Sequence, residues 1–128
     1  MALFQRQPTE ISQKLPYSLS LNTKTILVVG LGNPGKQYEL TRHNIGFGAL
    51  DNFAKSSGFD HFQDKPKFKG LVAKKNLAQK KVVLLKPTTF MNDSGESVQQ
   101  LANFYKIMPS DIVCVYDELS IPFGQIRM

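Results

Sequence analysis

The sequence predicts an α/β fold in which helices flank a mixed, mostly parallel twisted sheet. Short apolar runs rich in β-branched residues alternate with segments of helical periodicity, in the order β-α-β-β-α-β. Two of the strands are joined by only a short polar turn, so this pair is expected to be antiparallel within the sheet. With 128 residues, the chain is long enough for one domain whose core needs no disulfide or metal support.

The first strand and the first helix are separated by a loop that contains several glycines. Residues 25–29, TILVV, form a continuous apolar run, which is the pattern of a strand buried on both faces. Thr41 is expected to cap a helix that runs to about Ser57, and Gly58 then ends that helix. Residues 59–69 are expected to form a charged connection.

Two strands of a hairpin follow, and a further strand lies near the end of the sequence. Residues 70–77 and 81–87 are apolar runs on either side of a short polar turn. Residues 111–118, DIVCVYDE, predict another buried strand, with Cys114 as a small core residue. Residues 125–128 are expected to begin one more strand.

The second helix is predicted between the hairpin and the strand at 111–118. Asp93 and Glu96 have the spacing of a capping box at its start. Apolar residues then recur at i, i+3, i+4 and i+7, which is the pattern of an amphipathic helix: Val98, Leu101, Ala102 and Tyr105.

Composition restricts the class of protein. The single cysteine excludes an internal disulfide framework and suits a reducing compartment, and the two histidines and the cysteine have no metal-ligand spacing. The apolar runs are strand-sized, which excludes a membrane span. Residues 1–24 read as a loose N-terminal extension ahead of an α/β domain at 25–128. No signal peptide is visible, which favours the cytoplasm; an organelle is the alternative if residues 1–24 are a transit peptide.

The glycine loop has the spacing of a dinucleotide-binding turn, but its context is wrong. The pattern G-x-G-x-x-G follows the first strand directly, at Gly30, Gly32 and Gly35. A dinucleotide site needs a helix that opens on the glycines and an acidic residue at the end of the second strand. Here Pro34 favours a turn, and Asp51, at the right distance, falls inside the expected helix. An NAD-type oxidoreductase is therefore disfavoured.

Several polar residues instead point to hydrolysis by activated water. With Thr41 as the cap, His43 is at the second helical position, where the helix terminus favours a neutral imidazole that can accept a proton from water. Asp117 is at the end of the predicted strand at 111–118, and Asn33 and Asn92 follow other predicted strands, so the sheet can bring the three together at one edge. No serine or cysteine beside them offers a nucleophile. The alternative is structural, because such residues are common in turns and helix caps.

Three sequence blocks resemble the bacterial-type peptidyl-tRNA hydrolase family. They are VVGLGNPGKQYELTRHNIGF, KPTTFMNDSG and VYDELSIPFGQIR, in the order and spacing of that family, and the resemblance runs from about Thr25 to Met128. It implies a peptidyl-tRNA hydrolase-like α/β fold and hydrolysis of the ester between peptide and tRNA, which recycles tRNA for translation. It implies no metal or organic cofactor.

The resemblance also implies roles for individual residues. His43 matches the general base of the family, and Asp117 the carboxylate that stabilises its reactive form. Asn33 matches the amide that distinguishes a blocked aminoacyl group from a free one. Three further positions match contacts to the tRNA end or the peptidyl group: Tyr38, Phe90 and Asn92.

The implied partner is peptidyl-tRNA, bound through its acceptor arm and CCA end, with no membrane partner and a monomeric full-length form. Eight lysines and no acidic residue lie between Lys65 and Lys86. This run is either a solvated hairpin or a surface that contacts tRNA phosphates. Neutralising four of these lysines is expected to weaken tRNA binding if they contact phosphates: Lys74, Lys75, Lys80 and Lys81.

The sequence departs from the family pattern at both ends. It carries the extension at residues 1–24, and it lacks the last third of the family's length, so the predicted fold is incomplete at the C-terminus. That third holds another active-site asparagine, a lid and a closing helix. We therefore expect residues 1–128 to cleave peptidyl-tRNA weakly or undetectably, and a restored C-terminal part to recover cleavage. A non-catalytic RNA-binding module, or an inactive fragment, on the same fold is the alternative function.

Overall fold

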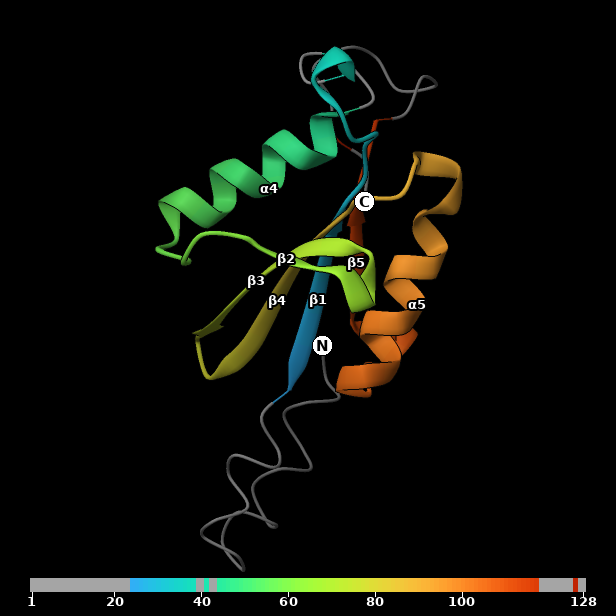
Figure 1. The fold of residues 1–128 in the computed structure, drawn as a ribbon. Helices are drawn as coiled ribbons and strands as arrows, with labels where there is room; N and C mark the ends of the chain where they lie inside the picture. The colour runs from blue at the N-terminus through green and yellow to red at the C-terminus, as the bar shows by residue number, and fades with distance from the viewer. Residues whose placement is uncertain (1–23, 39–40, 42–43, 118–125, 127–128) are drawn as a thin grey trace, which may run out of the picture.

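The computed structural model describes residues 24–38, 41, 44–117 and 126, and they form a five-stranded sheet with two α-helices (Figure 1). The predicted extension lies outside the described residues except for Lys24, as does the predicted strand at 125–128 except for Ile126. The helices are α4 (Ile45–Ser56) and α5 (Ser94–Tyr105). The strands are β1 (Thr25–Gly30), β2 (Gln63–Lys65), β3 (Gly70–Leu77), β4 (Lys80–Pro87) and β5 (Ile112–Val115).

The strands are ordered β2-β3-β4-β1-β5 across the sheet. β1 pairs in parallel with β4 and with β5, whereas β3 is antiparallel to both β2 and β4. β3 therefore runs against the other four strands of the described sheet. This arrangement confirms the predicted mixed sheet with flanking helices. It also brings the carboxyl ends of β4, β1 and β5 to the same edge.

The two helices cover opposite faces of the sheet (Figure 1). Alternate residues of β4 point to the two sides, so Val83 packs in the cluster under α5 and Leu84 in the cluster under α4. Leu101 of α5 and Leu50 of α4 are the helix residues most deeply buried in these clusters. The continuous apolar runs are thus explained, because the central strands are buried on both faces. No helix of the described residues is long and apolar enough to span a bilayer.

The β3–β4 hairpin agrees closely with its prediction. β3 has the predicted bounds, and β4 begins one residue earlier than expected, at Lys80. The two-residue turn consists of Ala78 and Gln79, whose φ angles are 50° and 64°. Positive φ at both positions is the mark of a type I′ turn, whose twist matches that of the flanking strands.

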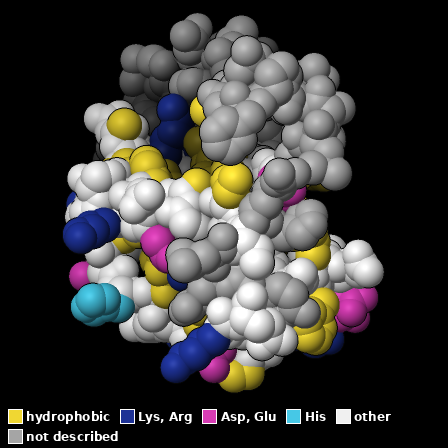
Figure 2. All heavy atoms as spheres, turned by 90° about the horizontal axis from the view of Figure 1, so that it is seen from above, with side chains coloured by type: hydrophobic (Ala, Val, Ile, Leu, Met, Phe, Trp, Pro, Cys, Tyr) yellow, Lys and Arg dark blue, Asp and Glu magenta, His cyan; other side chains and the backbone are white. Residues whose placement is uncertain are grey.

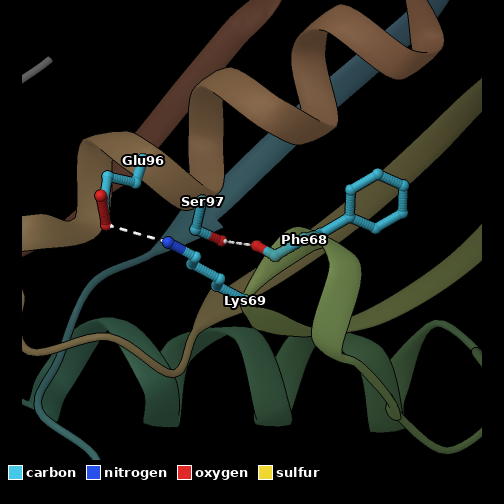
Figure 3. A network of polar contacts seen from close by, with 4 residues as sticks. All are labelled: Phe68, Lys69, Glu96 and Ser97. Atoms are coloured by element: carbon cyan, nitrogen blue, oxygen red, sulfur yellow. Dashed lines mark hydrogen bonds and ion pairs between the residues drawn. The ribbon is translucent and has the colours of Figure 1, made fainter.

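The predicted start of α4 and the predicted capping box of α5 need correction. α4 begins at Ile45, with Asn44 and not Thr41 at the N-cap position. The Asn44 side chain makes no cap hydrogen bond, because it bonds the main chain of Asn33. α5 begins at Ser94 as the spacing predicted, but no capping box forms at Asp93. Glu96 instead pairs with Lys69, at 3.3 Å between carboxylate and ammonium (Figure 3).

The burial predicted for the strand at 111–118 was also wrong. β5 spans only Ile112–Val115, Val113 is 47% exposed, and Cys114 is exposed and not a core residue. The reason is that β5 is the edge strand of the described sheet, with a neighbour on one side only. β2 was missed altogether, because its three residues, QDK, are exposed and carry no apolar alternation.

Gly46 sets how closely α4 approaches the sheet. A Cβ atom at this position would lie 2.3 Å from the Val115 carbonyl oxygen and 2.5 Å from the Leu31 nitrogen. Gly46→Ala should therefore destabilise the protein by about 1–3 kcal/mol in denaturant unfolding. Gly48→Ala, in the same helix, meets no atom within 4 Å and should stabilise by about 1 kcal/mol. Equal unfolding free energies for the two variants would contradict this close approach.

Candidate active site

The predicted site residues that the structure describes follow the carboxyl ends of three parallel strands, β1, β4 and β5. The Leu31 N–H, just past β1, donates to the Val115 carbonyl at the end of β5 with a distance of 3.0 Å. The chain after β1 leads to α4 on one face, whereas the chain after β4 leads to α5 on the other (Figure 1). Ligands of open α/β sheets bind at such a switch point, where neighbouring connections diverge.

Asn33 bridges the two diverging loops. Its side-chain Oδ1 accepts a hydrogen bond of 2.7 Å from the Met91 N–H, in the segment that follows β4. Because this bond uses the oxygen, the Nδ2 group is the end of the Asn33 amide that can donate to a ligand. The orientation of the Asn33 amide is therefore fixed by the main chain of the neighbouring loop.

Asn44 holds the main chain of Asn33 in place. The Asn44 Oδ1 accepts from the Asn33 N–H at 2.8 Å, and the Asn44 Nδ2 donates to the Asn33 carbonyl at 3.0 Å. Asn44 is 7% exposed, and both of these bonds are partly buried. Sequence reasoning missed this residue, since its partner lies 11 positions away and no local pattern marks the pair. The only indication in the sequence was that Asn44, which has an amide side chain, directly follows His43.

A hollow of about 320 Å³ opens beside the Asn33 loop. It lies between that loop, the start of α4 and the end of β4, and its lining includes Gly35, Lys36, Asn44, Phe47, Lys86 and Thr88. The Lys86 ammonium bonds the carboxylate of Asp51, which lies in α4. Asp51 is thus not at a strand end, and α4 does not open on the glycines. Both facts agree with the rejection of a dinucleotide site.

The structure places some of the other predicted site residues in this region. Phe90, 57% exposed, and the exposed Asn92 flank Met91, which is bonded to Asn33. Asp117 is partly exposed two positions past β5, the strand next to β1. Tyr38 ends a short 3-10 helix, Lys36–Tyr38, in the loop after β1. His43 lies outside the described residues, so its distance to Asp117 stays untested.

Cys114 is a poor candidate for a nucleophile. Partial desolvation raises the pKa of its thiol above the usual value of 9.0, so the thiol is protonated at neutral pH. A protonated thiol does not attack a carbonyl readily. In the part of the chain that the structure describes, no cluster of three or more His, Cys, Asp or Glu residues could hold a metal ion.

The eight lysines between Lys65 and Lys86 do not form a single surface. On the α4 face, the Lys75 ammonium donates to the Ser57 carbonyl at 2.7 Å, and Lys86 pairs with Asp51. Other lysines of the run lie on the α5 face. In the view of Figure 2, the Lys and Arg side chains stand apart, with acidic, hydrophobic and uncharged groups between them. To contact a tRNA phosphate, the Lys75 ammonium would therefore have to give up its hydrogen bond to the Ser57 carbonyl at the end of α4.

Asn44→Ala should loosen the Asn33 loop. The variant leaves the Asn33 N–H and carbonyl without their side-chain partner, which should cost about 1–3 kcal/mol of stability. Amide hydrogen exchange at Asn33 and Met91 should become faster, because both amides belong to the same clamp. The matched control is Asn52→Ala, an exposed asparagine of α4 that should change neither rate. Equal exchange rates in the two variants would show that Asn44 does not hold the loop.

Comparison with known sequences identifies related proteins. The family model described as peptidyl-tRNA hydrolase matches residues 27–128. The peptidyl-tRNA hydrolase of Clostridium perfringens is 52% identical over 103 residues, which are 80% of this chain and 54% of that protein. The peptidyl-tRNA hydrolase of Desulfitobacterium hafniense is 53% identical over 102 residues, which are again 80% of this chain and 54% of that protein. The chain therefore spans about half the length of these relatives, less than the two thirds expected from the resemblance.

Solved structures give the same result for the fold. The chain is similar to the crystal structure of peptidyl-tRNA hydrolase from Acinetobacter baumannii, with a TM-score of 0.72 and 42% sequence identity. The match covers 76% of this chain and 49% of the other. A second crystal structure, of peptidyl-tRNA hydrolase in complex with N-propanol, matches with the same TM-score and identity.

Proposed function

The chain belongs to the peptidyl-tRNA hydrolase family, and from that premise we propose that it hydrolyses the ester bond between peptide and tRNA. The observation that carries the proposal is the Asn33 amide, which is fixed across the switch point by Asn44 and Met91. A donor held in this way can bind the acyl part of a substrate without further reorganisation. Asp117 and Asn92 come from the neighbouring strand ends.

We propose that water is the nucleophile and His43 the general base. His43 accepts a proton as the water oxygen attacks the ester carbonyl carbon. The ester C–O bond then breaks, and the terminal ribose oxygen of the tRNA leaves with that proton. Asp117 orients the imidazole and stabilises its charged form, as a carboxylate does in other imidazole-based sites. The peptide is released as a carboxylate, and the tRNA is free for reuse.

In this proposal, one residue recognises the blocked aminoacyl group and three others contact the rest of the substrate. The Asn33 Nδ2 donates to the blocked aminoacyl group, which distinguishes it from a free one. Tyr38, Phe90 and Asn92 contact the peptidyl group or the CCA end of the tRNA. The exposure of Phe90 supports this role, since a terminal base can stack on an accessible ring. We further propose a cytoplasmic location and, for the full-length family form, a monomer.

Hydrolysis of a blocked substrate tests the proposed function. With the protein in excess over N-acetyl-aminoacyl-tRNA, a single turnover should release tRNA, whereas free aminoacyl-tRNA should stay intact. The same assay applies to a chimaera that continues after Met128 with the remaining part of the Clostridium perfringens relative. Cleavage of both substrates at the same rate would contradict the role of Asn33. Cleavage of neither substrate by the chain or the chimaera would contradict the proposed function.

A further inference from the structure

An aromatic cluster lies on the α5 side of the sheet. Phe68 ends the 3-10 helix Pro66–Phe68 and packs against the last turn of α5. Its ring centroid is 5.2 Å from that of Phe104 and 6.5 Å from that of Tyr105, and the last two rings are 5.0 Å apart. Phe68 is only 6% exposed, but Phe104 is 55% exposed. The exposed Phe104 ring therefore packs against the buried Phe68 ring.

Three lysines gather over these rings. The Lys67 ammonium lies 4.1 Å from the Phe104 centroid, and those of Lys81 and Lys74 lie 4.6 Å and 5.9 Å from the Tyr105 centroid. None of the three is ion-paired with a carboxylate of the described residues. We call this surface the lysine–aromatic face: Lys67, Phe68, Lys74, Lys81, Phe104 and Tyr105.

The lysine–aromatic face is held in shape by α5. The Ser97 hydroxyl, fully buried, donates to the Phe68 carbonyl at 2.6 Å, and the adjacent residues Lys69 and Glu96 form an ion pair (Figure 3). These contacts attach the segment before β3 to the helix that carries Phe104. A hollow of about 110 Å³ adjoins the face, between Phe68, Tyr105, Lys65 and Lys74, with Asp60 at its lining. The face is therefore preorganised, which lowers the cost of binding.

The lysine–aromatic face lies on the α5 side of the sheet, whereas the hollow beside Asn33 lies against the start of α4. Lys81 is level with Thr25, the first residue of β1. Asn33 and Asp117, in contrast, follow the last residues of β1 and β5. The face thus shares no residue with the lining of the hollow beside Asn33.

We propose that the lysine–aromatic face binds single-stranded RNA. Lysine ammonium groups beside an exposed ring match the two features of such a strand, its phosphates and its unpaired bases. Lys67, Lys74 and Lys81 contact the phosphates, and a base stacks on Phe104. The protein's net charge of +6 adds a general attraction to polyanions. The substrate of the proposed function is itself an RNA, but binding at this face needs neither the ester nor His43.

Fluorescence anisotropy with a labelled single-stranded RNA of about 12 nucleotides tests the proposal on the 128-residue chain. Phe104→Ala should weaken binding about tenfold, because stacking on this ring is lost. The control is Phe53→Ala, which removes a 41% exposed ring on α4 and should leave affinity unchanged. Lys67→Ala should reduce the slope of log affinity against log salt by about 0.7, whereas Lys67→Arg should restore it. Lys55→Ala, which removes an exposed lysine of α4, should not change the slope.

The outcomes separate the proposal from its alternatives. A duplex RNA of equal length and inorganic polyphosphate should both bind more weakly than the single strand, since neither offers an unpaired base. If polyphosphate bound as tightly as the single strand, base stacking on Phe104 would be overturned. If Phe104→Ala and Phe53→Ala changed RNA affinity equally, the lysine–aromatic face would be overturned as the binding site. Thermal melting checks that each variant is folded. His43→Ala should retain RNA binding, so a failure of the proposed hydrolysis is distinguishable from a failure of this inference.

Discussion

His43→Ala should lower the rate of ester cleavage by about 10²- to 10⁴-fold, the usual contribution of a general base. Alanine cannot accept the proton of the attacking water, whereas binding of the substrate through other residues should persist. The expected result is therefore a fall in the maximal single-turnover rate, with little change in the protein concentration that gives half of that rate. Single-turnover cleavage of N-acetyl-aminoacyl-tRNA measures the effect in the chain and in the chimaera with the Clostridium perfringens relative.

The control for this variant is His61→Ala. His61 is the only other histidine of the chain, and its side chain is exposed in the connection between α4 and β2. Its removal should leave the cleavage rate unchanged, and both variants should unfold at the same denaturant concentration as the parent. A His43→Ala protein that retains near-full turnover would show that another group accepts the proton.

Asp117→Asn should reduce turnover by about 10²-fold or more while substrate affinity is retained. An amide is neutral, so it neither stabilises the imidazolium nor favours the same imidazole tautomer. Loss of a neighbouring negative charge also disfavours the protonated imidazole. The acidic limb of the pH–rate profile should therefore move to lower pH, which is checked by measuring cleavage across the pH range.

The matched control for Asp117 is Asp60→Asn. Asp60 is an exposed carboxylate between α4 and β2, at a distance from the strand ends that carry the candidate site. This variant should keep both the rate and the pH–rate profile. If Asp117→Asn behaves like Asp60→Asn, then Asp117 is only a turn residue.

Elements that depend on local pattern were predictable from the sequence. The β3–β4 hairpin follows from two apolar runs and a polar turn, and α5 follows from the spacing of Leu101, Ala102 and Tyr105. Features that depend on distant partners were not. The exposure of Val113 results from the position of β5 at the sheet edge, which no local pattern reveals.

The candidate site shows the same division. Residue types and their position after strands were enough to propose Asn33 and Asp117, because the carboxyl ends of parallel strands meet. The start of α4 was misplaced: the helix begins at Ile45, and the Asn44 side chain bonds the Asn33 main chain instead of capping the helix. Thr41 therefore does not support the argument that His43 occupies the second helical position. The proposed role of His43 stands on the family motif.

Isotope transfer from water tests the central claim most directly. The chain, and the chimaera with the Clostridium perfringens relative, are incubated in excess over N-acetyl-aminoacyl-tRNA in water labelled with oxygen-18. If water attacks the ester carbonyl, the released N-acetyl amino acid carries one labelled oxygen in its carboxylate, and the tRNA gains none. Release of product without the label would contradict water as the nucleophile, and absence of release from both proteins would contradict peptidyl-tRNA hydrolysis itself.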